Sequence, residues 1–144
     1  MDSMLRNCYS LTTINLSGFS TTQVISMSGM FENCGKLESL NLSHFITNKT
    51  NDMSFMFNNC TSLKFLKLGF NTEKVKDMQF MFSTCIELTS LDISSFDTNA
   101  CQNYENMFLN DTELNVVIDS SISPDLRKNI PDYVNVTDIK KIFK

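Results

Sequence analysis

The sequence contains few of the residues on which most enzyme and cofactor sites depend. Among its 144 residues are one histidine, His44, and four glycines, and no two of its five cysteines form a Cys-x-x-Cys pair. Zinc sites draw on closely spaced cysteine and histidine ligands, and phosphate-binding loops need clustered glycines. We therefore expect no metal centre, no nucleotide loop and no other cofactor.

Long apolar runs and an excess of positive charge are also missing. No apolar stretch approaches the roughly 20 residues that span a bilayer, so we expect no membrane insertion. The 12 Lys and Arg residues are outnumbered by 16 Asp and Glu, giving a net charge of −4, which argues against a nucleic-acid partner. The N-terminal residues lack a basic segment followed by an apolar one, so no signal peptide is expected in this chain.

A motif recurs along most of the chain. The sequence MSGMFENCGKLESLNLSHF at residues 27–45 returns as MSFMFNNCTSLKFLKLGF from Met53 and as MQFMFSTCIELTSLDISSF from Met78. A truncated copy begins at Met1 and a decayed copy at Tyr104, so the intervals are 26, 26, 25 and 26 residues. The single deletion follows Leu68. A period this regular predicts that each copy is one structural unit that packs against its neighbours.

Each copy shows two hydrophobic periods in succession. In the second copy, the spacing i, i+3, i+4, i+7 predicts a helix of about two turns, and the alternation that follows it predicts a short strand. The residues of the helical period are Met27, Met30, Phe31 and Cys34, and those of the strand are Leu40 and Leu42. Residue types that cap helices precede the helical period in four copies: Ser26, Asp52, Asp77 and Asn103.

These patterns predict an α/β fold, a leucine-rich-repeat solenoid of about five stacked repeats, with a short parallel sheet and short helices on the other side. The repeats occupy residues 1–119, and residues 120–144 form a C-terminal capping segment. Within this segment, Ser123 and Pro124 predict a helix start and Pro131 its end. A short strand is expected at residues 133–136, and a final helical turn at 138–144.

The repeated methionines, phenylalanines and cysteines fall in columns that we interpret as core. A methionine stripe is also compatible with a peptide-binding groove, although helical spacing beside Leu and Phe columns favours a core. The cysteine column is interpreted as free buried thiols, with disulfides between adjacent copies as the alternative. The column members are Cys8, Cys34, Cys60 and Cys85, and Cys101 occupies a second inward position.

The variable residues of the strands predict an exposed face that binds a partner. Phe65 stands out on this face because the other copies carry Thr13, Ser39, Ser90 and Val116 there, and an exposed aromatic among polar residues is a common interface anchor. A lone apolar surface residue is the alternative interpretation. A surface ion pair is expected between Lys67 and Asp92. The predicted binding residues are Thr13, Asn15, Ser39, Asn41, Phe65, Lys67, Ser90 and Asp92.

The motif MxxMFxxCxxLxxLxLSxF, followed by a Thr and an Asp before the next Met, is similar to the repeats of BspA-type leucine-rich repeat surface proteins of bacteria and protozoa. The resemblance covers residues 1–119 and implies adhesion to host or extracellular-matrix proteins, and a cell-surface or secreted location. It carries over no catalytic residues. The short length and the lack of a signal peptide depart from the family pattern and leave the location open.

The sequence therefore predicts a non-catalytic protein-binding module, with adhesion as its role. An intracellular scaffold or regulator of the same architecture is the second hypothesis, because free cysteines and the missing signal peptide favour it. An enzyme or glycan-processing domain with an unrecognised site is the third, although nothing in the sequence places a nucleophile, a base and an orienting group, such as Ser, His44 and Asp, together. The first copy begins without a capping element, which suggests a fragment or an end-to-end homodimer through the N-terminal repeat.

Overall fold

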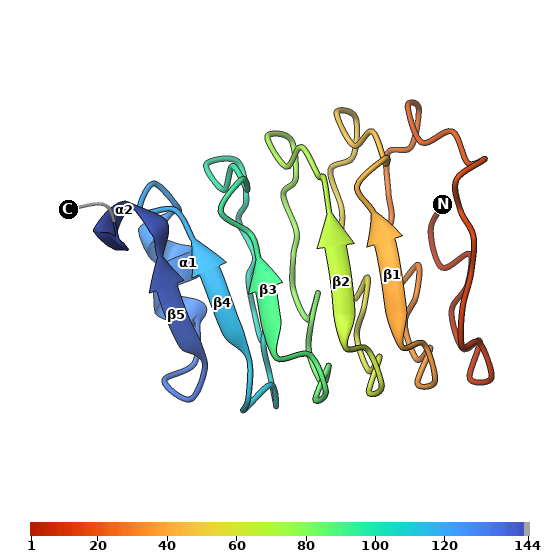
Figure 1. Cartoon of the computed structure of the whole chain (residues 1–144). Helices are drawn as coiled ribbons and strands as arrows, with labels where there is room; N and C mark the ends of the chain where they lie inside the picture. The colour runs from red at the N-terminus through yellow and green to blue at the C-terminus, as the bar shows by residue number, and fades with distance from the viewer. Residues whose placement is uncertain (143–144) are drawn as a thin grey trace.

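The computed structural model describes residues 1–142, and most of this backbone is irregular. Regular elements are short and follow the order of the chain in Figure 1. They are the strands β1 (Ser39–Leu42), β2 (Phe65–Leu68), β3 (Ser90–Asp92) and β4 (Asn115–Ile118), the helix α1 (Pro124–Asn129), the strand β5 (Asn135–Asp138) and the helix α2 (Ile139–Ile142). Within residues 1–142, no helix is long and apolar enough to cross a membrane.

The strands form two parallel sheets. One contains β1 and β2, with Leu40 opposite Leu66, and the other contains β3, β4 and β5, with Val116 between Leu91 and Val136. The predicted fold class, an α/β leucine-rich-repeat solenoid of about five stacked repeats with helices opposite one sheet, is therefore wrong. The chain is mostly coil, with sheets of two and three strands and very little helix.

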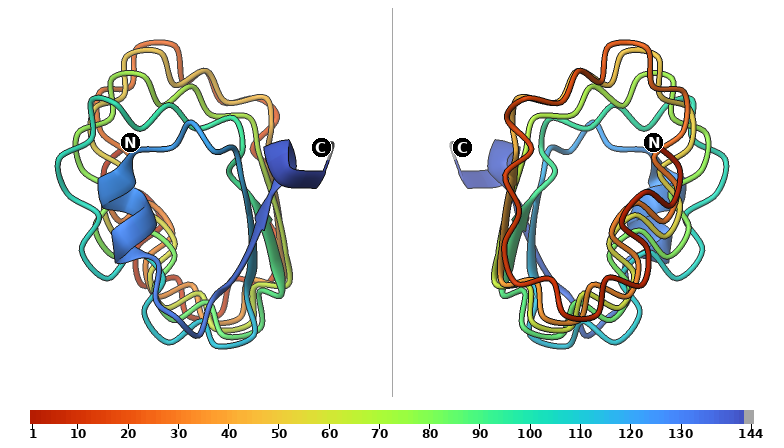
Figure 2. Two further views of the ribbon diagram at one scale, coloured as in Figure 1. Left: turned by 90° about the vertical axis from the view of Figure 1, so that its left-hand side faces the viewer. Right: turned by 90° about the vertical axis from the view of Figure 1, so that its right-hand side faces the viewer.

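Successive copies of the sequence motif nevertheless contact one another. Figure 1 shows each copy as a loop that follows the previous one along the molecule, and the end-on views in Figure 2 place the strands on one side of these loops and tight turns on the opposite side. Parallel bridges join Ser26 to Asp52, Asp52 to Asp77 and Asp77 to Asn103. Equivalent residues of neighbouring copies thus lie side by side.

The helix predicted at residues 27–34 is replaced by a series of tight turns, and the same holds for its equivalents in the other copies. The N–H groups of Gly29, Phe31 and Asn33 donate to carbonyls of the next copy at 2.9 Å, while the N–H groups between them donate three residues back within their own copy. Gly29 and Asn33 have positive φ angles of 59° and 63°, which interrupt a right-handed helix. Every second backbone N–H group therefore donates to the neighbouring copy and not to a carbonyl within a helix.

The residues predicted to cap these helices form hydrogen bonds at the start of the turns. The side-chain oxygens of Asp52, Asp77 and Asn103 accept the N–H two residues later at 2.9 to 3.1 Å, and the hydroxyl of Ser26 does so at 3.2 Å. These contacts are Asx-type turns, in which a side chain mimics a backbone turn. The prediction that these residues cap helices is therefore wrong, because a tight turn and not a helix follows them.

The columns predicted to form the core are buried in the middle copies. Phe31, Phe57, Phe82 and Phe108 stack in sequence with ring centroids 5.6 to 5.8 Å apart. The methionines from Met27 to Met107 and the cysteines Cys34, Cys60 and Cys85 are fully buried as well. Exceptions lie mainly in the first copy, where Met4 is 41% and Phe19 is 44% exposed, and Cys8 and Cys101 are only half-buried.

The C-terminal segment largely follows its predicted pattern. Helix α1 starts after Ser123, whose hydroxyl accepts the Leu126 N–H at 3.1 Å, and Pro124 occupies its first turn. The predicted strand appears as β5, two residues later than expected, and the final helical turn as α2. The part of that last prediction that concerns residues 143–144 lies outside the described residues. Figure 2 places α1 on the side of the tight turns, whereas α2 lies beyond the strands.

Candidate functional site

All eight residues predicted to bind a partner are exposed on the outer surface of the loops. Ser39 and Asn41 belong to β1, Phe65 and Lys67 to β2, and Ser90 and Asp92 to β3. Thr13 and Asn15 precede the first strand and lie in irregular backbone. The alternation of buried and exposed residues in β1 and β3 directs the predicted residues outward, as a half-buried strand requires.

Three of the eight side chains accept hydrogen bonds in the turns that end the strand segments. The side-chain oxygens of Asn15, Asn41 and Asp92 accept the N–H two residues later, at 3.0, 3.0 and 2.9 Å. Asn41 also accepts the hydroxyl of Ser43 at 2.8 Å. Lys67 occupies the same column in the third copy and cannot accept a hydrogen bond. Lys67 is therefore the member of this column that is free for another role.

The strand ladder is interrupted between β2 and β3, where one sheet ends and the other begins. The copy that contains β2 is one residue shorter than its neighbours, and Gly69 follows the strand in place of a larger residue. A side chain at Gly69 would come within 2.5 Å of the Ser43 carbonyl oxygen, so glycine permits this close approach. The shortened turn holds the end of β2 against the β1 copy, and the sheet opens on its other side.

This interruption, which we call the β2–β3 seam, uncovers part of the core. Leu40, Leu42, Leu91 and Ile93 point inward from β1 and from the β3 copy and are at most 6% exposed. Their equivalents in β2, Leu66 and Leu68, are only half-buried. Apolar surface is therefore accessible at β2.

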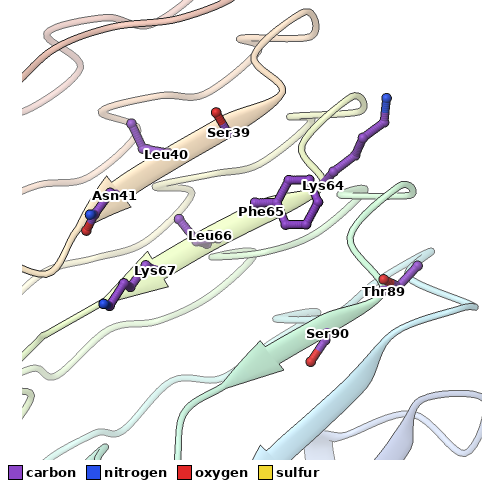
Figure 3. Close-up of a pocket in the computed structure, with 9 residues that line it drawn as sticks. All are labelled: Ser39, Leu40, Asn41, Lys64, Phe65, Leu66, Lys67, Thr89 and Ser90. Atoms are coloured by element: carbon purple, nitrogen blue, oxygen red, sulfur yellow. The ribbon is translucent and has the colours of Figure 1, made fainter.

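A hollow of about 410 Å³ lies beside Leu40 and Leu66 and extends from β1 to the start of β3. Figure 3 shows the side chains around it, with the Phe65 ring rising between the neighbouring strands. A second hollow of about 430 Å³ lies on the other side of Phe65. The first is lined by Ser39, Leu40, Asn41, Lys64, Phe65, Leu66, Lys67, Thr89 and Ser90, and the second by Lys64, Phe65, Glu87 and Thr89.

The Phe65 side chain is 72% exposed, the highest exposure among the large apolar residues of residues 1–142. Burying an aromatic ring of this kind in an interface removes a large apolar area from water. The equivalent residues on the neighbouring strands are Ser39 and Ser90, so no second ring covers it. The ring and the two hollows beside it form a surface on which a partner can make apolar contact.

The charges around Phe65 are only partly neutralised. The ammonium group of Lys64 lies 3.5 Å from a carboxylate oxygen of Glu87, and both side chains are about half exposed. The predicted ion pair between Lys67 and Asp92 is not formed, and Lys67 has no ion-pair partner within residues 1–142. The strands that carry these two residues, β2 and β3, belong to different sheets. A cation is thus left on this face, two residues beyond the exposed ring.

The environments of the histidine and of two column cysteines follow from their contacts and burial. A ring nitrogen, Nε2, of His44 lies 3.0 Å from the Leu16 carbonyl, and the ring packs edge-on against Phe45. Burial raises the pKa of Cys34 to about 11 and that of Cys60 further, so both are protonated thiols at neutral pH. Among the described residues, no group of three His, Cys, Asp or Glu residues is placed to hold a metal ion.

The structure brings together five of the eight predicted residues and adds others. Ser39, Asn41, Phe65, Lys67 and Ser90 line the first hollow, while Thr13, Asn15 and Asp92 do not. The sequence analysis did not identify Leu40, Lys64, Leu66, Thr89 or Glu87 as part of the site. Leu40 was identified only as a member of a predicted strand, and the opposite charges of Lys64 and Glu87 on adjacent copies were the signal that could have indicated their contact.

Comparison with known proteins identifies one family. The family described as Mycoplasma protein of unknown function, DUF285, matches the chain over residues 1–67 and 41–144, two overlapping ranges that together include every residue. No curated protein and no solved structure matches the chain significantly.

Proposed function

Because the chain belongs to the DUF285 family, whose function is unknown, we propose a function from its own surface: it is a non-catalytic protein-binding module that uses the outer face of β1, β2 and β3. The observation that carries this proposal is the exposed Phe65 ring beside two hollows. Interface anchors are typically aromatic side chains that become buried in the centre of a contact. The surrounding Ser, Asn, Thr and Lys side chains supply the polar rim that such contacts have.

We propose further that the module is adhesive and that its partner is a host or extracellular-matrix protein. The support is the similarity of the repeated motif to BspA-type surface repeats. The intracellular scaffold or regulator is the second candidate, favoured by the five free cysteines, since structural thiols in secreted proteins are usually oxidised. Fractionation of cells that express the native protein separates the two, because adhesion requires the protein at the surface or in the medium.

The proposal is tested by capturing partners on the full chain and on matched variants. Immobilised chain is exposed to purified matrix proteins and to a host-cell extract. Phe65→Ser and Lys67→Asn are introduced together, because Ser39 and Asn41 show that the neighbouring strand carries these residues. Ile86→Ser serves as the control, since Ile86 is 50% exposed but lies outside both hollows.

We expect a captured protein to be lost from the double variant and retained by the control. Circular dichroism before and after heating shows whether each variant is folded. Equal capture by the unmodified chain and the double variant would contradict the use of this face. Capture of nothing by the full chain, under conditions in which it is folded, would contradict the protein-binding function itself.

A further inference from the structure

We propose that the hollow at the β2–β3 seam binds an extended acidic peptide segment, which places an apolar residue against Phe65 and a carboxylate against Lys67 two residues further on. This inference rests on the proposed function and specifies the chemistry of its partner. The remaining contacts of the segment are with Ser39, Asn41 and Ser90.

The spacing along β2 matches that of an extended partner. Phe65 and Lys67 are two residues apart in a strand, so their side chains leave the same face about 6.7 Å from each other. An extended peptide repeats its own side chains on one face at the same interval. A peptide that lies along β2 therefore matches both positions with residues i and i+2.

The seam provides the apolar part of the site. Leu66 is half-buried and lines the hollow together with Leu40, and the Phe65 ring forms one wall (Figure 3). An apolar side chain in this position covers the exposed ring, and the apolar area that is removed from water favours binding. An aromatic side chain gains further stabilisation from its contact with the ring.

The charges around the hollow select an acidic residue for the second position. Lys67 forms no ion pair with residues 1–142, while Lys64 is already engaged by Glu87 at 3.5 Å. The nearby carboxylate of Asp92 accepts the Ser94 N–H at 2.9 Å and does not line the hollow. A carboxylate of the peptide thus finds an unpaired ammonium group, and a lysine in the same place is repelled by it.

The test uses the full chain and two fluorescent peptides of the same composition. The first is Ser-Thr-Ser-Phe-Ser-Glu-Ser-Thr-Ser, with the apolar and acidic residues at i and i+2, and the second is Ser-Thr-Ser-Phe-Glu-Ser-Ser-Thr-Ser, with the two adjacent. Binding is measured by fluorescence polarisation at low salt, because screening weakens an exposed ion pair. We expect the first peptide to bind, and Phe65→Ser to weaken it at least about tenfold, as loss of an interface anchor does.

The variants separate the two contacts. Lys67→Glu is expected to abolish binding of the first peptide and to permit binding of a version in which its Glu is replaced by Lys, and Ile86→Ser is expected to leave every affinity unchanged. Equal affinity for the two orders, no effect of Phe65→Ser, or no binding of the first peptide to the folded chain would overturn the inference. The broader function still stands in any of these cases if capture of an intact protein depends on Phe65 and Lys67, because the contact then has another geometry.

Discussion

Asp111 occupies the position that a cysteine holds in the other copies, and its carboxyl group is buried. The side chain is 1% exposed, and one oxygen, Oδ1, accepts the Cys85 N–H at 2.7 Å. The other oxygen, Oδ2, has no hydrogen-bond partner among the described residues. Burial raises the pKa of Asp111 to about 7, because an ionised carboxylate is costly away from water. The substitution therefore makes the stability of this end of the molecule depend on pH.

We expect the free energy of unfolding to fall as pH rises from about 4 to about 7. The unfolded chain releases the Asp111 proton near pH 4, whereas the folded chain keeps it until about pH 7, so the folded state is favoured below this window and loses that advantage across it. Urea unfolding at a series of pH values measures this change. Asp111→Asn retains an acceptor for Cys85 and removes the titration, so a difference between variant and unmodified chain that is constant with pH would contradict the assignment.

The buried cysteines are expected to resist alkylation. Each thiol of Cys34, Cys60 and Cys85 donates to a carbonyl of the preceding copy at 3.2 Å, and burial raises the pKa of all three. Only the thiolate reacts with alkylating reagents. We expect these three to remain unmodified by iodoacetamide at pH 8 in the folded chain, while the half-buried Cys8 reacts. Mass spectrometry after timed quenching measures the rates, and equal rates at Cys8 and Cys60 would contradict the burial.

The strand β2 shows how one missing residue changes an element. The turn that follows it is shorter than its equivalents, and Gly69 packs onto the backbone of Ser43. The strand keeps its pairing with β1 and loses its pairing with β3. The two inward leucines of β2 are then less covered than those of the strands on either side. The exposed surface of the site thus lies on the strand that this shortened turn follows.

Gly69→Ala is expected to destabilise the chain by about 1 to 3 kcal/mol, the usual cost of forcing an extra group into a packed site. The added carbon would lie 2.5 Å from the Ser43 carbonyl oxygen, which is part of the backbone and cannot rotate away. Gly18→Ala is the matched control, because nothing lies within 4 Å of its added carbon. Urea unfolding compares the two, and equal effects would show that the turn does not pack as described.

A second comparison tests the exposure of the core at the seam. Leu42 and Leu68 are opposite one another in β1 and β2, but Leu42 is fully buried and Leu68 is half-buried. We expect Leu42→Ala to cost about 2 to 5 kcal/mol, as truncation of a buried leucine does, and Leu68→Ala to cost clearly less. Thermal and urea unfolding provide the measurement. Losses of the same size would mean that the leucine column is closed throughout.

At the scale of the whole molecule, the repeating spacing predicted which side chains are buried but not how the backbone buries them. Met27, Met30, Phe31 and Cys34 are all fully buried, as their helical spacing indicated. A series of tight turns that project every third or fourth side chain to one side produces the same pattern, so burial period alone cannot separate it from a helix. Asparagine recurs seven residues into four of the copies, in three of them one position before the cysteine, and adopts positive φ at Asn7, Asn33, Asn59 and Asn110. That column was the available signal against a helix, because asparagine tolerates this conformation.

Part of the candidate site could also be predicted from the repeated sequence. Phe65 and Lys67 differ from their columns in the sequence itself, and the structure places both on the outer face beside the hollow. The break between β2 and β3 could not be foreseen, because strand pairing depends on the separation of two backbones and not on any residue type. The 25-residue interval identified the copy that carries the deletion. It did not show whether β2 would lose its pairing with β1 or with β3.

Backbone N–H groups of the tight turns donate alternately within their own turn and to the next copy. This arrangement affects where the chain can gain or lose residues. The hydrogen bonds to the next copy fasten each loop to its neighbour along the edge opposite the strands, and the stacked phenylalanines continue past β2 without interruption, with Phe57 and Phe82 5.6 Å apart. Loss of one residue on the strand edge is therefore absorbed locally. A chain built in this way can gain or lose residues on its strand side, one loop at a time, while the hydrogen bonds along the opposite edge are kept.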